Sequence, residues 1–213
     1  MKRGDAMKLY DFSLAPNSRR VRVFLAEKGI DTPLVSVNTR ENEHFSDWFR
    51  EKNSACTVLE LNDGTCISES VAICRYFEGL QPEPCLMGAM PEEAARIEMW
   101  NRRMELDGMA AAGEAFRNSV PAFADRALPG IDPVAQIPDL AQRGKERLSR
   151  FYERLDEVLA KTPYVAGESY SIADITALVA IDFAGWIKIQ PDESLVNIAG
   201  WYGRVSSRPS ASA

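Results

Sequence analysis

Histidine is almost missing from this sequence, since His44 is the only one among 213 residues. A Ser-His-Asp hydrolase would have to use that single ring, and no G-x-S-x-G elbow accompanies it. A metal site built from several histidines is excluded. Long apolar runs are missing too: none approaches the roughly 18 residues that span a bilayer, and the first residues lack the apolar stretch of a secretion signal. We therefore expect a soluble, cytoplasmic protein with no membrane partner.

Cysteine is scarce and scattered. The four cysteines, Cys56, Cys66, Cys74 and Cys85, form no C-x-x-C pair, so a dithiol redox centre of the thioredoxin kind is absent. Their spacing fits no zinc knuckle either, and we expect no metal. We interpret them as reduced thiols of a cytoplasmic protein, with one functional cysteine as the alternative.

Positive charge is in the minority, because 25 lysines and arginines face 31 aspartates and glutamates, for a net charge of −6. A nucleic-acid partner is therefore not expected. A small anionic ligand remains possible, since a local site can oppose the overall charge. The apolar fraction of 46% is ordinary for a globular chain.

The first 80 residues predict strands alternating with helices. We expect strands over 7–12, 34–39, 57–61 and 65–68, and helices from Asn17 or Ser18 to about Gly29, over 42–52 and over 69–80. Asparagine and serine suit a helix N-cap, and glycine suits the residue after a helix. A strand, a helix and a strand within about 30 residues predict a parallel pair. Asp63-Gly64 predicts a tight hairpin between the last two strands.

The rest of the chain predicts only helices. After a proline-rich linker at 83–90, we expect helices over 91–116, up to about 161, over 171–187 and over 193–206. A segment with four prolines, 118–139, predicts a long loop that is functional or partly mobile. The sequence thus predicts an α+β domain over 1–82 in the order β-α-β-α-β-β-α, followed by an all-α helical bundle over 91–213.

Several motifs, taken in order, resemble one family. Three runs in the first 80 residues resemble the thioredoxin-like domain of bacterial glutathione S-transferases. They are LYDF-(x)3-PNSRRVRVFLAEKGI, N-x-x-x-TV and DGTCISES-VAICRYFE. YVAGESYSIADITALV resembles the capping-box helix of their C-terminal domain. The resemblance implies a homodimeric, cytoplasmic detoxification enzyme that transfers the glutathione thiolate to a hydrophobic electrophile. The alternative is a glutathione-binding or ligand-binding relative with little transferase activity.

The resemblance also implies a glutathione site. Glu69 and Ser70 match the acidic-Ser pair that binds the γ-glutamyl group, although both would also serve as a plain helix cap. Val58 matches the residue whose backbone pairs with the cysteinyl group. The family's cis-proline is replaced by Leu59, so the Val58–Leu59 bond is either strained or trans. His44 falls near the position that meets the glycyl carboxylate, or else it is a surface histidine.

The position that activates the thiol is atypical. The family places Tyr, Ser or Cys there, and the match falls on Ala15, which has no donor. Asn17 is the first replacement candidate, followed by Ser13 and Ser18. Asn17 and Ser18 could equally be helix caps, and Ser13 could be a loop hydroxyl without a role.

Two arginines follow these candidates in the expected first helix. Arg19 and Arg20 could raise the positive potential near the thiolate. A solvated helix face is the alternative interpretation.

Overall fold

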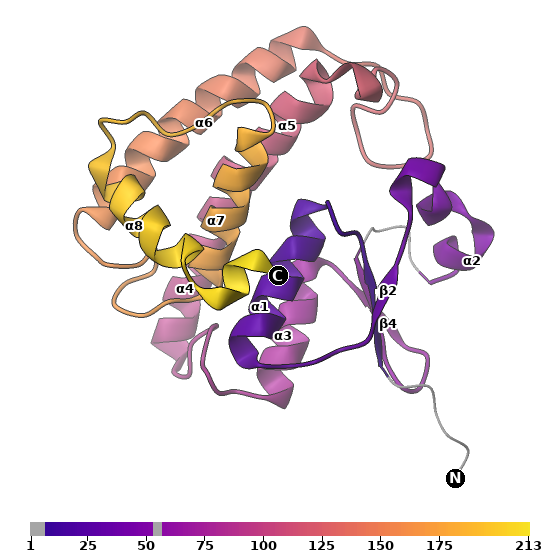
Figure 1. Cartoon of the computed structure of the whole chain (residues 1–213), viewed down its shortest axis with the longest axis horizontal. Coiled ribbons are helices and arrows are strands. Elements are labelled where there is room, and N and C mark those ends of the chain that lie inside the picture. The colour runs from indigo at the N-terminus through magenta and orange to yellow at the C-terminus, as the bar shows by residue number, and fades with distance from the viewer. Residues whose placement is uncertain (1–6, 53–56) are drawn as a thin grey trace. The chain divides into compact units, whose positions relative to one another are not determined.

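The structure, a computed structural model, describes residues 7–52 and 57–213. The chain divides into two compact units between Pro84 and Cys85. The first is a mixed α/β domain, and the second is built from helices (Figure 1). This confirms the predicted fold class, a thioredoxin-like domain followed by a helical domain.

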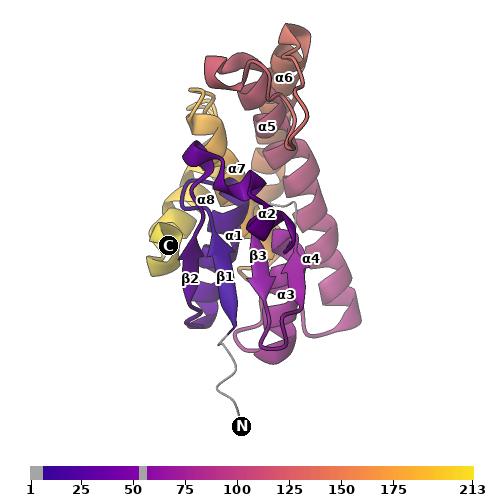
Figure 2. The ribbon, with the colours of Figure 1, turned by 90° about the vertical axis from the view of Figure 1, so that its right-hand side faces the viewer.

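The N-terminal unit is organised by a four-stranded sheet. Its strands are β1 (Lys8–Asp11), β2 (Leu34–Ser36), β3 (Val58–Glu60) and β4 (Cys66–Ser68), in the order β2-β1-β3-β4. Strand β1 is parallel to β2 and antiparallel to β3, and β3 pairs antiparallel with β4. The predicted βαβ unit and hairpin are therefore both confirmed. Figure 2 looks onto this sheet.

Two helices cover one face of the sheet. They are α1 (Pro16–Lys28) and α3 (Ser70–Leu80), which lie side by side, while the short α2 (Asp47–Arg50) lies on the other side (Figure 1). Two 3-10 turns, η1 (Thr39–Glu41) and η2 (Glu43–Phe45), precede α2. Apolar side chains between the sheet and the α2 side form one buried cluster, namely Tyr10, Phe12, Val37, Phe49 and Val58.

Helix α1 begins earlier than the sequence predicted. Its N-cap is Ala15, which makes no side-chain capping bond, and Pro16 occupies the first helical position. The prediction of Asn17 or Ser18 as the cap was therefore wrong. The physical reason is that proline has no N–H to satisfy and its fixed φ suits the first turn. Gly29 ends the helix with φ 63°, as expected.

A buried lysine joins the ends of α1 and α3. The Lys28 side chain is 0% exposed and its Nζ lies 2.6 Å from the Glu78 carboxylate. Nζ also donates to the carbonyls of Gln81 and Pro84, at 2.7 and 2.8 Å, and more weakly to that of Pro82 at 3.4 Å. The last carbonyls after α3 thus receive their hydrogen bonds from α1.

The C-terminal unit is a bundle around one apolar helix. Its α-helices are α4 (Pro91–Arg103), α5 (Ala110–Ser119), α6 (Pro138–Leu159), α7 (Ile172–Gly185) and α8 (Val196–Ser206), with short 3-10 turns η4 (Pro121–Phe123) and η5 (Pro209–Ser212). Residues 171–181 are all buried, so α7 is the central helix. In the described part of the chain, no helix is long and apolar enough to cross a bilayer.

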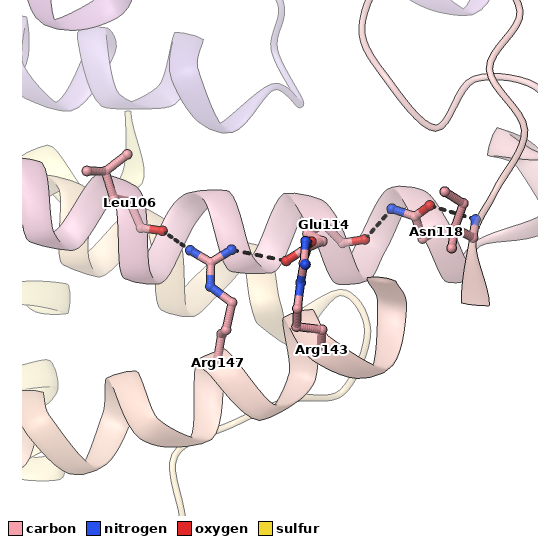
Figure 3. Close-up of polar contacts among 6 residues, drawn as sticks. Leu106, Glu114, Asn118, Arg143 and Arg147 are labelled. Carbon is pink, nitrogen blue, oxygen red and sulfur yellow. Dashed lines mark hydrogen bonds and ion pairs between the residues drawn. The ribbon is translucent and has the colours of Figure 1, made fainter. Parts of the chain in front are cut away.

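The predicted long helix after the linker contains a π-helical segment. This segment, η3 (Met104–Met109), joins α4 to α5. Arg147 of α6 donates to the Leu106 carbonyl within it at 2.6 Å and to Glu114 of α5 at 3.0 Å (Figure 3). Arg143 also binds Glu114. Burial alone would raise the pKa of Glu114, but the two guanidinium groups lower it below its usual range.

The loop after α5 is tied back to that helix. The Gln136 amide donates to the carbonyls of Arg117 and Val120, at 2.7 and 2.8 Å. The side-chain oxygen of Asn118 accepts from the backbone of Ile137 at 2.9 Å. Side chains of the loop and of the last turn of α5 therefore satisfy backbone groups at the end of this helix and hold the loop against it.

The predicted capping box at α7 is confirmed. Ser171 is the N-cap and accepts from the Ala173 amide, while the Asp174 carboxylate accepts from the Ser171 amide at 3.0 Å. Asp174 is fully buried and also accepts from the Val165 amide at 2.9 Å and from the Trp201 indole at 2.8 Å. One carboxylate therefore joins the start of α7 to α8 and to the loop ahead of α7.

Candidate functional site

The N-termini of α1 and α3 meet through three polar side chains. The Asn17 side-chain oxygen accepts a hydrogen bond from Arg20 Nη2 at 2.8 Å. The Ser70 hydroxyl donates to the same oxygen at 3.4 Å. Asn17 is exposed, whereas Ser70 and Arg20 are buried. The structure therefore brings the first predicted thiol donor next to the predicted γ-glutamyl site.

Arg20 lies inside the α1–α3 interface. Its side chain is only 1% exposed, so the interpretation of a solvated helix face was wrong for this residue. Its positive charge acts on the thiol of Cys74 on α3. Burial nevertheless raises the pKa of the Cys74 thiol to about 12. Cys74 is therefore a neutral packing residue.

Glu69 has a strained backbone. Its φ of 70° and ψ of 115° lie in a region that residues other than glycine rarely adopt. Such strain costs on the order of 1–3 kcal/mol and clusters at functional sites. The Glu69 side chain is exposed. Beside it, residues 70–72 open α3 with amides that precede its first helical bond, donated by Ile73. A carboxylate and a set of free amides thus lie at one helix end, which suits a ligand carrying both charges.

The other thiol-donor candidates differ in what they can reach. The Ser18 hydroxyl is buried, accepts from the Phe12 amide at 3.2 Å and lies 2.7 Å from the Thr57 hydroxyl. These contacts fix the β1–α1 loop, and the role of Ser18 as a thiol donor stays a prediction. Ser13 is exposed in the turn ahead of α1, and its carbonyl accepts from Arg22 at 2.9 Å.

The strand that holds Val58 and Leu59 is central in the sheet. Both side chains are fully buried, and both residues pair with β1 on one side and β4 on the other. The Val58–Leu59 bond is trans, which resolves the alternative left open by the sequence. Thr57 is buried directly ahead of the strand and bonds Ser18, a link that the sequence reasoning missed because it placed Thr57 inside the strand. Cys56 lies outside the described residues.

His44 is not the surface residue that one interpretation expected. It is 8% exposed, and its ring packs on Phe45 at 3.8 Å between centroids and edge-on to Phe12 at 5.7 Å. The interpretation of a surface histidine was therefore wrong, and the role of His44 near the glycyl carboxylate stays a prediction.

The described residues offer no cluster of metal ligands. No group of three or more histidine, cysteine or acidic side chains is placed to hold an ion there. Among the described residues, Cys66, Cys74 and Cys85 carry thiols that no disulfide joins.

Comparison with known proteins agrees with this architecture. Residues 15–80 match the family model of the glutathione S-transferase N-terminal domain, and residues 121–209 match that of the C-terminal domain. Glutathione S-transferase 2 of Saccharomyces cerevisiae is 36% identical, across 97% of this chain and 90% of the relative.

Solved structures give the same result. A glutathione S-transferase domain-containing protein of Marinobacter aquaeolei VT8 superposes with a TM-score of 0.88 at 37% identity, covering 95% of this chain and 98% of that one. Gtt2 of Saccharomyces cerevisiae gives 0.88 at 33% identity, covering 96% and 98%. The chain belongs to the glutathione S-transferase family.

Proposed function

We propose that the junction of α1 and α3 binds glutathione and activates its thiol for transfer to a hydrophobic electrophile. Glu69 pairs with the ammonium of the γ-glutamyl group. The Ser70 hydroxyl and the first amides of α3 bind its carboxylate, helped by the positive end of the helix. Asn17 donates its side-chain amide to the sulfur. The thiol proton leaves to solvent, the thiolate forms a carbon–sulfur bond, and the electrophile's leaving group departs with its electron pair.

The orientation of Asn17 carries this proposal. Arg20 can only donate hydrogen bonds, so the Asn17 atom 2.8 Å from it must be the oxygen. The amide nitrogen is therefore the group that remains for a ligand. A hydrogen bond to a charged partner contributes roughly 1.5–3 kcal/mol, which corresponds to a thiol pKa lowered by about one to two units. The amides at the start of α1 add to this effect.

Replacing Asn17 tests the donor. We expect Asn17→Ala to raise the pKa of the bound thiol by about one unit or more and to lower kcat/KM about tenfold at neutral pH. The measurement is the pH dependence of kcat/KM with a chloronitrobenzene substrate. Asn17→Asp is the matched control, because its carboxylate still accepts from Arg20 and Ser70 but has no N–H. It should retain the fold and be at least as inactive; full activity in either variant would contradict the role of Asn17.

Replacing Glu69 tests separately its effect on glutathione affinity and the cost of its strained backbone. We expect Glu69→Gly to weaken glutathione binding about tenfold or more, because an ionic hydrogen bond is lost, without lowering the stability of the N-terminal unit. Glycine adopts a positive φ readily, so relief of strain offsets its greater entropy in the unfolded chain. Calorimetric titration with glutathione and urea unfolding measure the two effects.

Glu69→Gln is the control for charge alone, since it keeps a side chain of the same length on the strained backbone and removes only the negative charge. It should bind glutathione as weakly as Glu69→Gly without any gain in stability. Unchanged affinity in both variants would show that Glu69 is only a helix cap.

A second function, glutathione binding with little transfer, is favoured by Ala15. That residue caps α1 without any side-chain hydrogen bond, so the usual hydroxyl or thiol donor is missing. Retention on glutathione resin together with measurable chloronitrobenzene turnover supports the enzyme. Retention without turnover supports the binding protein.

Family membership is the only support for the oligomeric state, the location in the cell and the biological role. We propose a homodimer in the cytoplasm with a role in detoxification, and glutathione as co-substrate without a metal. Sedimentation equilibrium measures the oligomeric state directly.

A further inference from the structure

We infer that Arg20 is a positioning residue for thiol activation: it fixes which atom of the Asn17 amide faces the ligand. The inference rests on the proposed function, because it assigns a cause to the orientation on which that function depends. Arg20 itself is 1% exposed and does not reach the surface where the ligand would lie.

The two hydrogen bonds on Asn17 are not equivalent. A serine hydroxyl can donate or accept, so Ser70 would bond either end of the Asn17 amide equally well. A guanidinium has five N–H donors and no acceptor, so Arg20 tolerates only the oxygen. Arg20 is therefore the partner that excludes the turned amide, in which the carbonyl oxygen would face the thiolate and repel it.

The setting of Arg20 makes this constraint rigid. Arg20 lies one helical turn after Asn17, its side chain is 1% exposed, and its charge acts on Cys74 of α3. Burial strengthens a hydrogen bond because water does not compete for the donor. An exposed residue thus takes its orientation from a buried one behind it.

The expected size of the effect is bounded. If the two amide orientations become equally populated without Arg20, the competent fraction and kcat/KM fall about twofold. If the turned amide dominates, the loss approaches that of Asn17→Ala. We expect Arg20→Gln to lie between these limits, since glutamine can accept as well as donate. Arg20→Lys should retain most of the activity, because an ammonium, like a guanidinium, only donates.

A double-mutant cycle tests the inference. kcat/KM with a chloronitrobenzene substrate and its pH profile are measured for Asn17→Ala, Arg20→Gln and the double variant, with unfolding curves for each. If Arg20 acts through Asn17, Arg20→Gln raises the apparent thiol pKa in the natural background and changes nothing further in the Asn17→Ala background. Equal losses in both backgrounds, or a loss in Arg20→Lys as large as in Arg20→Gln, would overturn it.

The controls separate the possible failures. Arg19→Met removes a positive charge from the neighbouring position of α1 and should not shift the thiol pKa as Arg20→Gln does; an equal shift would indicate general electrostatics and overturn the positioning role. Arg20→Met replaces Arg20→Gln in the cycle if the latter does not fold. A fully active Asn17→Ala would refute the proposed thiol donor, and Arg20 as its positioner with it. A defective Asn17→Ala with additive Arg20 losses would refute the inference alone.

Discussion

Replacing Asp174 by alanine is expected to destabilise the C-terminal unit by about 4 kcal/mol or more. The buried carboxylate accepts from the amides of Val165 and Ser171 and from the Trp201 indole. Each stranded buried donor costs about 1–3 kcal/mol, and the three cannot be hydrated without opening the bundle. Urea unfolding followed by circular dichroism measures the loss.

The control for Asp174 is an exposed loop aspartate whose carboxylate also accepts local hydrogen bonds but can be reached by water. Asp192 accepts from the amide and hydroxyl of Ser194, at 2.9 and 2.6 Å, in an exposed loop. Asp192→Ala should change the free energy of unfolding far less than Asp174→Ala, because water replaces the lost acceptor. If the two variants lost similar stability, burial would not be the cause.

Replacing Lys28 by methionine is expected to cost the N-terminal unit about 3–5 kcal/mol. The change keeps an unbranched side chain in the buried site and removes the ammonium with its charge and its N–H donors. It leaves the Glu78 carboxylate without the ammonium that lies 2.6 Å away, and removing one partner of a buried pair is strongly destabilising. The free energy of unfolding in urea, compared with the natural chain, measures the effect.

Two further variants test the cause. Lys52→Met breaks the ion pair with Glu60, whose members are 25% and 22% exposed, and should cost no more than about 1 kcal/mol. Adding Glu78→Leu to Lys28→Met should recover much of the loss, since a buried pair can be replaced by apolar groups. No recovery in the double variant would show that the carbonyl contacts of Lys28 dominate.

What the sequence predicted well was local. Ser171 and Asp174 are three residues apart and satisfy each other, so their spacing alone identified the helix start. The hairpin at Asp63-Gly64 was equally clear, because that turn needs glycine at the tip. Both signals depend on residues close together in the sequence, so they can be recognised without knowing how the helices and strands pack.

What the sequence could not predict depends on distant partners. Lys28 binds carbonyl oxygens more than 50 positions further along the chain. The spacing of residues around Lys28 gives no sign of such partners. Arg20 looked like a solvated charge because burial of an arginine is decided by the helix packed against it. Thr57, 39 residues after Ser18, lies against the Ser18 hydroxyl, a contact that the sequence does not indicate.

The π-helical segment η3 changes the direction in which the side chains of α5 point relative to those of α4. An extra residue in one turn rotates the chain beyond it by about 100° relative to a regular helix. Helix α4 and helix α5 therefore present side chains to their neighbours in two registers that differ by this rotation, although the run from Pro91 to Ser119 looks continuous. Glu114, which pairs with Arg143 and Arg147, lies in α5 and so in the second register. Because of this rotation, α4 packs against α7 and α5 packs against α6, each in its own register.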